Sequence, residues 1–169
     1  MNALIQSNLH YLSQAEHLLR QLEDQTFAQP AKGFYDSTIG GHLRHCLDHY
    51  DSFLNGLEDG KVDYDHRVRL PELETQTQSA LTKVLALSET LKNLSSQSPP
   101  VGLLIKMDCG SATIDWQPST LGRELQFLVS HTVHHFAMIG GICKELGIEL
   151  ESGFGVAPST LRHQAETTA

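Results

Sequence analysis

The chain has 169 residues, of which 40% are hydrophobic and 19% are charged, and its formal net charge is −8. A chain of this length buries about two thirds of its unfolded surface, so we expect a single domain over residues 1–169 that needs no disulfide framework or structural metal to fold. The acidic balance, without a long Lys/Arg cluster, argues against nucleic-acid binding because affinity for phosphates comes mainly from basic side chains.

Helical spacing of apolar residues predicts four long helices. The first covers about 1–23, and the second begins at the N-cap residue Ser37 and covers about 37–57. The third starts at a proline and covers about 71–93. The fourth is the longest and covers about 118–147, where a glycine ends it.

Two shorter segments complete the expected fold. Residues 101–116 read as a short β-hairpin between helices three and four. The glycine-rich tail around 153–161 is expected to form one short helical turn that packs back on the helices. The predicted fold class is therefore all-α, a four-helix bundle with a short hairpin.

Cysteine use and hydrophobic runs indicate a cytoplasmic protein. Cys46, Cys109 and Cys143 lie far apart and form no CxxC pair, which is typical of a reducing compartment. No apolar stretch approaches about 18 residues, and residues 1–20 are amphipathic, so we expect neither a membrane span nor a secretory signal. The number of histidines is unusual, and six of the 10 fall in two tight groups.

One histidine group lies on the fourth predicted helix. His131, His134 and His135 occupy positions i, i+3 and i+4 and share one face, beside the apolar stripe. Two imidazoles one turn apart can bind one metal ion. No glutamate follows the first histidine, so the pattern is not the HExxH motif of zinc proteases.

The second group, His42, His45 and His49, flanks the apolar stripe of the second predicted helix. Two such faces can meet in one groove of a bundle. Three histidines plus water form a sphere typical of catalytic transition metals. Helical angle alone places His42 and His49 nearer the stripe centre than His45, so the residues leave open which of them binds.

Both segments carry a recognisable pattern. The first is Ser37-Thr38-Ile39, followed by Leu43, His45, Cys46 and Leu47. The second is His131-Thr132-Val133-His134-His135, followed by Phe136-Ala137-Met138-Ile139. Together they resemble the DinB-like superfamily of damage-inducible four-helix metalloproteins. Met138 departs from the pattern, because a glutamine is common at that position.

The resemblance implies a bundle, often dimeric, in which three histidines bind a divalent ion such as nickel, zinc or iron. The matching positions are His45, His131 and His135, with His49 in reserve and His42 and His134 as neighbours that tune or substitute. The superfamily includes bacillithiol S-transferases, mycothiol-dependent maleylpyruvate isomerases and a domain of sulfoxide synthases, while many members have no demonstrated activity. A low-molecular-weight thiol and a second copy of the chain are the implied partners.

These observations lead to two main hypotheses and a weaker third. The first is a metal-dependent thiol S-transferase or hydrolase, because a bound divalent ion lowers the pKa of a water or thiol. The second is a non-catalytic, metal- or small-ligand-binding stress-response bundle. A DNA-associated role is suggested by the family name alone, and the net charge of −8 disfavours it.

Four further residues near the histidines have ordinary interpretations. Glu124 falls on the side of His131, where it can orient a ligand, but its first-turn position favours a helix-dipole role. Asp48 is expected to meet solvent, and Cys46 to be a small core residue. Tyr50 either reaches the site with its hydroxyl or fills the core with its ring.

Two arginines follow the second predicted helix. Arg67 and Arg69 can bind an anionic group in a bidentate manner. Surface ion pairs with Asp63 or Asp65 are the favoured alternative.

Overall fold

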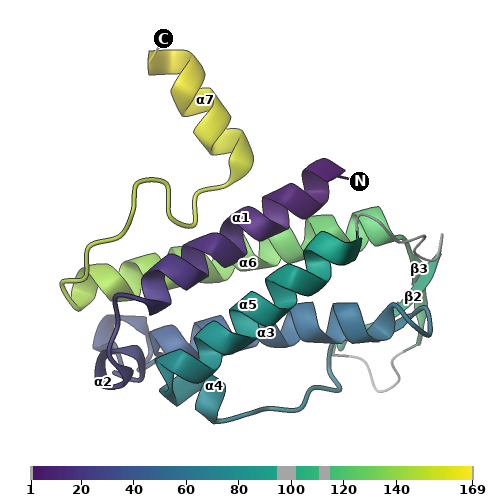
Figure 1. Ribbon diagram of the computed structural model, residues 1–169, viewed down its shortest axis with the longest axis horizontal. Helices are drawn as coiled ribbons and strands as arrows, with labels where there is room; N and C mark the ends of the chain where they lie inside the picture. Colours follow the sequence, from purple (N-terminus) through teal and green to yellow (C-terminus); the bar gives the residue numbers. More distant parts are fainter. Residues whose placement is uncertain (1, 95–101, 111–114, 169) are drawn as a thin grey trace.

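The computed structural model describes residues 2–94, 102–110 and 115–168, and it is mainly helical (Figure 1). Its long helices form a bundle, which confirms the predicted fold class. The elements in chain order are α1 (Asn2–Leu19), α2 (Asp24–Phe27), the 3-10 helix η1 (Lys32–Phe34), α3 (Ile39–Gly56), β1 (Lys61–Asp63), α4 (Glu72–Thr75), α5 (Thr77–Leu94), β2 (Leu103–Lys106), β3 (Gln117–Ser119), α6 (Leu121–Glu145) and α7 (Pro158–Thr168).

The long helices pack in a ring around one core. Helix α1 packs against α5 and α6, and α3 also packs against α5 and α6. Figure 1 shows α3 and α6 running along the length of the bundle. Apolar side chains from every long helix fill the interior, including Leu12, Leu43, Val84 and Leu128. Their burial follows the helical stripes, which is why four helices were predictable.

The helix ends differ from the predictions by a few residues. Thr38, rather than Ser37, caps α3, since its Oγ1 accepts a hydrogen bond from the amide of Gly41 at 2.8 Å. The third predicted helix is two helices, because Gln76 is extended (φ −126°) and separates α4 from α5. At Gly40 a Cβ would lie 2.0 Å from the carbonyl oxygen of Glu74, so glycine permits the close approach of α3 and α4.

A small sheet lies at one end of the bundle. Strands β2 and β3 form the predicted antiparallel hairpin between α5 and α6, with Leu103 opposite Ser119. Strand β3 lies at Gln117–Ser119, just after the predicted hairpin ends, and residues 111–114 of that hairpin lie outside the described residues. Strand β1 was not predicted, and it pairs parallel to β2 with Lys61 opposite Leu104.

The tail corrects one prediction. Helix α7 has 11 residues instead of one turn, and it projects away from the bundle rather than packing along it (Figure 1). Its residues are mostly exposed, because the helix carries few apolar side chains to bury. Among the described residues, no helix combines the length and hydrophobicity that crossing a membrane requires.

Candidate metal centre

Helices α3 and α6 lie against each other and bring both histidine groups to one seam. His45 from α3 and His131 and His135 from α6 each offer a ring nitrogen, and these three atoms lie within 4.8 Å of one another. We call these three residues the histidine cluster. Nε2 of His45 is 3.1 Å from Nε2 of His131.

These distances suit one shared ion. Histidine nitrogens bind zinc at about 2.0–2.1 Å, so two nitrogens on one ion lie roughly 3–3.5 Å apart. The 3.1 Å between His45 and His131 falls in that range. One pair of the cluster thus has the spacing of two ligands on one ion, and His135 offers a third donor atom within 4.8 Å of both.

The remaining histidines surround the cluster. Nδ1 of His42 lies 2.9 Å from Nδ1 of His135, and its Nε2 lies 3.2 Å from Oγ of Ser37. Nδ1 of His49 donates to the carbonyl oxygen of His45 at 2.9 Å, and its ring stacks on His131 with centroids 4.0 Å apart. His134 is exposed. The structure thus places His42 and His49 beside the cluster, where they position its rings.

Burial keeps the cluster neutral. Partial burial, followed by the neighbouring histidines, lowers the pKa of His131 to about 2. The same causes lower the pKa of His45 to about 3 and that of His135 to about 4. All three rings are therefore uncharged near neutral pH, and each has a lone pair available for an ion.

The hydrogen-bond pattern within the cluster is incomplete. Nδ1 of His131 is buried and has no hydrogen-bond partner. A guanidinium can only donate, so Nη1 of Arg67, 3.0 Å from Nδ1 of His45, makes that nitrogen an acceptor. The proton of His45 then lies on Nε2 and points at Nε2 of His131, whose own proton is left on the unpartnered Nδ1. Both Nε2 atoms would be free to bind an ion only with the His45 proton on Nδ1.

Arg67 is the main site residue that the sequence analysis misplaced. The favoured interpretation was a surface ion pair, but Asp63 instead accepts the amides of Asp65 and His66 at 3.0 and 3.1 Å. Asp65 accepts the amide of Asp108 at 2.5 Å. Both carboxylates are occupied within the loop and sheet, so Arg67 turns inward to the histidines.

The acidic residues near the site are also more buried than their sequence context indicates. Asp48 was expected in solvent, yet it is only 5% exposed because Nη1 of Arg44 donates to it at 2.7 Å. Glu124 lies in the first turn of α6 as predicted, is fully buried, and accepts hydrogen bonds from Tyr64 (2.7 Å) and Ser119. Its carboxylate thus contacts these hydroxyls rather than the histidines.

The two other interpretations are resolved by burial. Cys46 is buried in the core, as predicted. Tyr50 is fully buried, and its hydroxyl donates to Oδ1 of Asn8 at 2.8 Å, so it belongs to the core rather than to the cluster.

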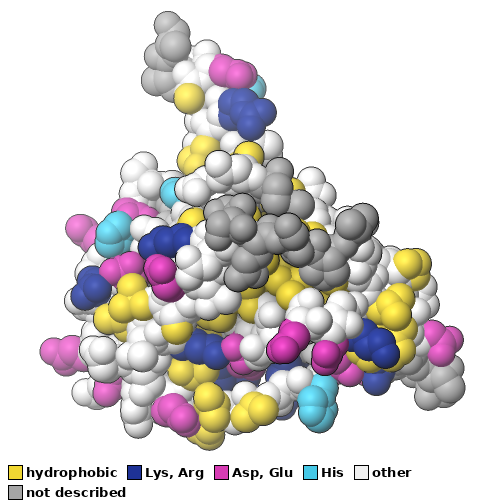
Figure 2. Space-filling view, turned by 45° about the vertical axis from the view of Figure 1, so that its right-hand side comes forward, with side chains coloured by type: hydrophobic (Ala, Val, Ile, Leu, Met, Phe, Trp, Pro, Cys, Tyr) yellow, Lys and Arg dark blue, Asp and Glu magenta, His cyan; other side chains and the backbone are white. Residues whose placement is uncertain are grey.

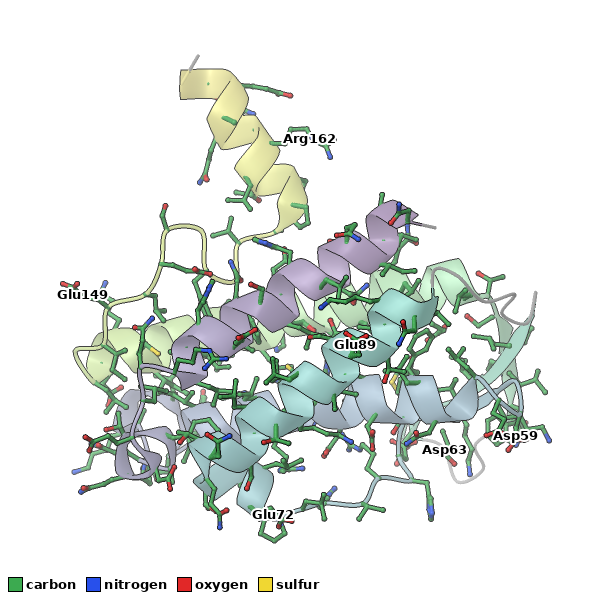
Figure 3. All side chains as sticks on the ribbon, viewed as in Figure 1. Asp59, Asp63, Glu72, Glu89, Glu149 and Arg162 are labelled. Atoms are coloured by element: carbon green, nitrogen blue, oxygen red, sulfur yellow. The ribbon has the colours of Figure 1, made fainter. Side chains whose placement is uncertain are left out.

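Two cavities flank the seam. One of about 460 Å³ is lined by His42, His45 and His135, together with Arg44 and Glu74. The other, of about 260 Å³, lies toward the sheet and is lined by Arg67 and several acidic side chains. Among these, Asp59 and Asp63 are seen near the strands in Figure 3. The first cavity therefore opens onto the histidine cluster, and the second reaches it only through Arg67, whose Nη1 contacts His45.

Comparisons with known proteins agree with this architecture. A protein named FK506-binding protein 5 from Rhizopus delemar is 36% identical over 109 residues, which cover 60% of this chain and 27% of that protein. The chain thus spans about a quarter of that relative's length. No solved structure matches the chain. The family model of the DinB superfamily matches residues 12–139, which is more than half of the sequence and includes both histidine groups. The chain therefore belongs to the DinB superfamily.

Proposed function

We propose that this protein binds a divalent transition metal, nickel, zinc or iron, through His45, His131 and His135. The proposal rests on one observation, the three ring nitrogens that lie within 4.8 Å of one another. The lowered pKa values of the rings and the unpartnered Nδ1 of His131 support it, because neutral imidazoles with poorly satisfied hydrogen bonds gain from a shared ion.

We further propose that the metal site is catalytic, as a thiol S-transferase or a hydrolase. When bound, an ion with open positions lowers the pKa of a water or thiol and supplies a nucleophile near neutral pH. The cavity of about 460 Å³ beside His42, His45 and His135 offers room for a low-molecular-weight thiol or another small substrate. A non-catalytic metal- or ligand-binding role is the alternative.

Elemental analysis of the purified protein tests the metal proposal. The wild type should hold about one equivalent of a transition metal, and His45→Ala, His131→Ala and His135→Ala should each lose it. His134→Ala is the matched control, since this histidine is on the same helix but is exposed. Metal content unchanged in all three variants would overturn the proposal.

Two assays of the metal-loaded protein separate the catalytic classes. Transfer of a small thiol to an electrophile indicates the transferase, and cleavage of esters or amides without thiol indicates the hydrolase. Metal binding without turnover in either assay would favour the non-catalytic alternative.

Partners and location remain part of the proposal. A homodimer in the cytoplasm is expected, and light scattering coupled to gel filtration tests the dimer. The described cysteines Cys46, Cys109 and Cys143 are unpaired, which suits a reducing compartment. On the face in Figure 2, Lys and Arg side chains are interspersed with acidic ones, which supports our expectation that nucleic acid is not a partner.

A further inference from the structure

Arg67 is a partly buried guanidinium whose charge acts on the Asp48 carboxylate, although the two do not form an ion pair. Among the described residues no carboxylate forms an ion pair with it, and its printed contacts are Nδ1 of His45 at 3.0 Å and Nδ1 of His49 at 3.5 Å. The His49 nitrogen already donates to a backbone carbonyl, so it cannot accept from Arg67. Nε of Arg67 is buried without a hydrogen-bond partner.

A comparison with Arg44 shows how unusual this is. Both guanidinium groups lie close enough to His45 to lower its pKa. Arg44 is neutralised by Asp48 at 2.7 Å and by Glu74. Arg67 interacts with the same Asp48 carboxylate only at longer range, and no described carboxylate lies within ion-pair distance of it. Because arginine stays charged and each unmet buried donor costs free energy, Arg67 has capacity for an anion that the protein does not fill.

Metal binding would free Arg67 further, and this step rests on the proposed function. If Nε2 of His45 binds an ion, the ring proton must lie on Nδ1. Nη1 of Arg67 would then face a donor instead of an acceptor and lose its 3.0 Å hydrogen bond. The guanidinium would become available one imidazole ring away from the ion.

We infer that Arg67 binds the carboxylate of a small ligand whose other end reaches the histidine cluster. Arginine matches a carboxylate with two parallel hydrogen bonds, and Nε together with one Nη is a suitable pair. The adjoining cavity of about 260 Å³ is also lined by Lys61 and by the carboxylates of Asp48, Asp51, Asp59 and Asp63. These acidic side chains repel phosphates and polyanions, so we expect the ligand to be a small monocarboxylate. For the proposed transferase, it would be a thiol that carries one carboxylate.

Binding of two matched thiols tests this inference. The probes are 3-mercaptopropionate, which carries a carboxylate, and 2-mercaptoethanol, which is neutral, and both are titrated calorimetrically into the zinc-loaded and the metal-free protein. The wild type should prefer 3-mercaptopropionate by about tenfold or more, as expected of a charge-assisted hydrogen bond. Arg67→Gln should bind the two probes equally, while Arg67→Lys should keep part of the preference.

Arg69→Gln is the matched control, because Arg69 lies on the same segment and is exposed. It should keep the full preference, and circular dichroism should show both glutamine variants folded. An equal affinity of the wild type for the two thiols, or a preference that survives in Arg67→Gln, would overturn the inference.

The outcome separates this inference from the metal proposal. Zinc binding without a carboxylate preference overturns the role of Arg67 and leaves the metal proposal intact. A preference that depends on Arg67 in a protein that takes up no metal leaves the anion site standing and overturns the metal proposal.

Discussion

Helix α6 makes two polar contacts with α3 that differ in burial and in how completely their hydrogen bonds are satisfied. In one, which we call the Asn8 cluster (Asn8, Tyr50 and Thr132), Nδ2 of Asn8 donates to the carbonyls of Leu4 and Leu125 at 2.8 and 3.1 Å. Its Oδ1 accepts from Tyr50, whose hydroxyl accepts from Thr132 at 3.3 Å.

The histidine cluster lies beside it, because His131 precedes Thr132, and His49, which stacks on His131, precedes Tyr50. Nδ1 of His131 and Nε of the adjacent Arg67 are buried without a hydrogen-bond partner. A closed network stabilises the fold, because every buried polar group has its partner. An open network of half-buried rings costs free energy at each buried atom without a partner, unless something else completes it. The contrast indicates that the Asn8 cluster serves structure and the histidine cluster serves a ligand.

The largest expected effect is on zinc affinity, which should depend on the histidine cluster and not on the Asn8 cluster. His131→Ala should weaken zinc binding by at least about 100-fold, since even residues that only support metal ligands cost about 10- to 100-fold. Thr132→Val, at the next residue, should leave the affinity unchanged. Competition against a chromophoric chelator measures both, and a similar loss in the two variants would contradict the division of roles.

The second effect is on stability. Asn8→Ala should lower the free energy of unfolding by about 2–3 kcal/mol, because the Tyr50 hydroxyl and the Leu125 carbonyl would lose a buried partner. Urea unfolding of the metal-free protein measures it. Zinc affinity should stay at the wild-type value, and an unchanged unfolding midpoint would show that the Asn8 cluster is not structural.

The sequence predicted which faces of α3 and α6 meet, but not which partners satisfy the hydrogen bonds of the polar groups there. The stripes of Leu43 and Leu128 placed the helices, and the helical spacing of His131 and His135 placed the histidines on one face. Asn8 lies three residues after Ile5 and four before Leu12, so the helical period places it on the buried face of α1. The period does not identify its partner Tyr50, which is distant in sequence.

Arg67 was unpredictable for a similar reason. Its segment is held by strand β1, which pairs parallel to β2 across about 40 residues of sequence. Such a non-local pairing leaves no short motif, so nearby aspartates were the natural partners to expect. Asp63 and Asp65 instead satisfy backbone amides. The proposed ligand set followed only from the family resemblance, because helical angle favoured His42 and His49.

A smaller effect is expected at a second closed network. Glu124 accepts hydrogen bonds from Tyr64, Ser119 and, at 3.1 Å, Arg123. Tyr64→Phe should cost about 1 kcal/mol of unfolding free energy, because two partners of the carboxylate remain. The Phe ring can keep the stacking on His49, which has centroids 5.4 Å apart. Thermal unfolding measures the loss, and a change in zinc affinity would instead link Glu124 to the metal centre.

The smallest expected effect is the response of zinc affinity to pH. In the folded protein the pKa of His45 is about 3, that of His131 about 2 and that of His135 about 4, against about 6.5 in an unfolded chain. Protons therefore do not compete for the three lone pairs above about pH 5. Calorimetry should show less than about a threefold change in affinity from about pH 7.5 to pH 5, whereas three ordinary histidines would lose about 10⁴-fold.

The same pKa shifts determine how the stability of the metal-free protein changes with pH. Below about pH 6.5 the unfolded chain binds protons at these histidines and the folded chain does not. The free energy of unfolding must then fall as the pH drops from about 6.5 toward 4, the pKa of His135. His131→Ala removes one of these protonations and should make the urea midpoint less sensitive to pH. The control variant Thr132→Val, in the Asn8 cluster, should leave the pH dependence unchanged, because that cluster contains no group that titrates in this range.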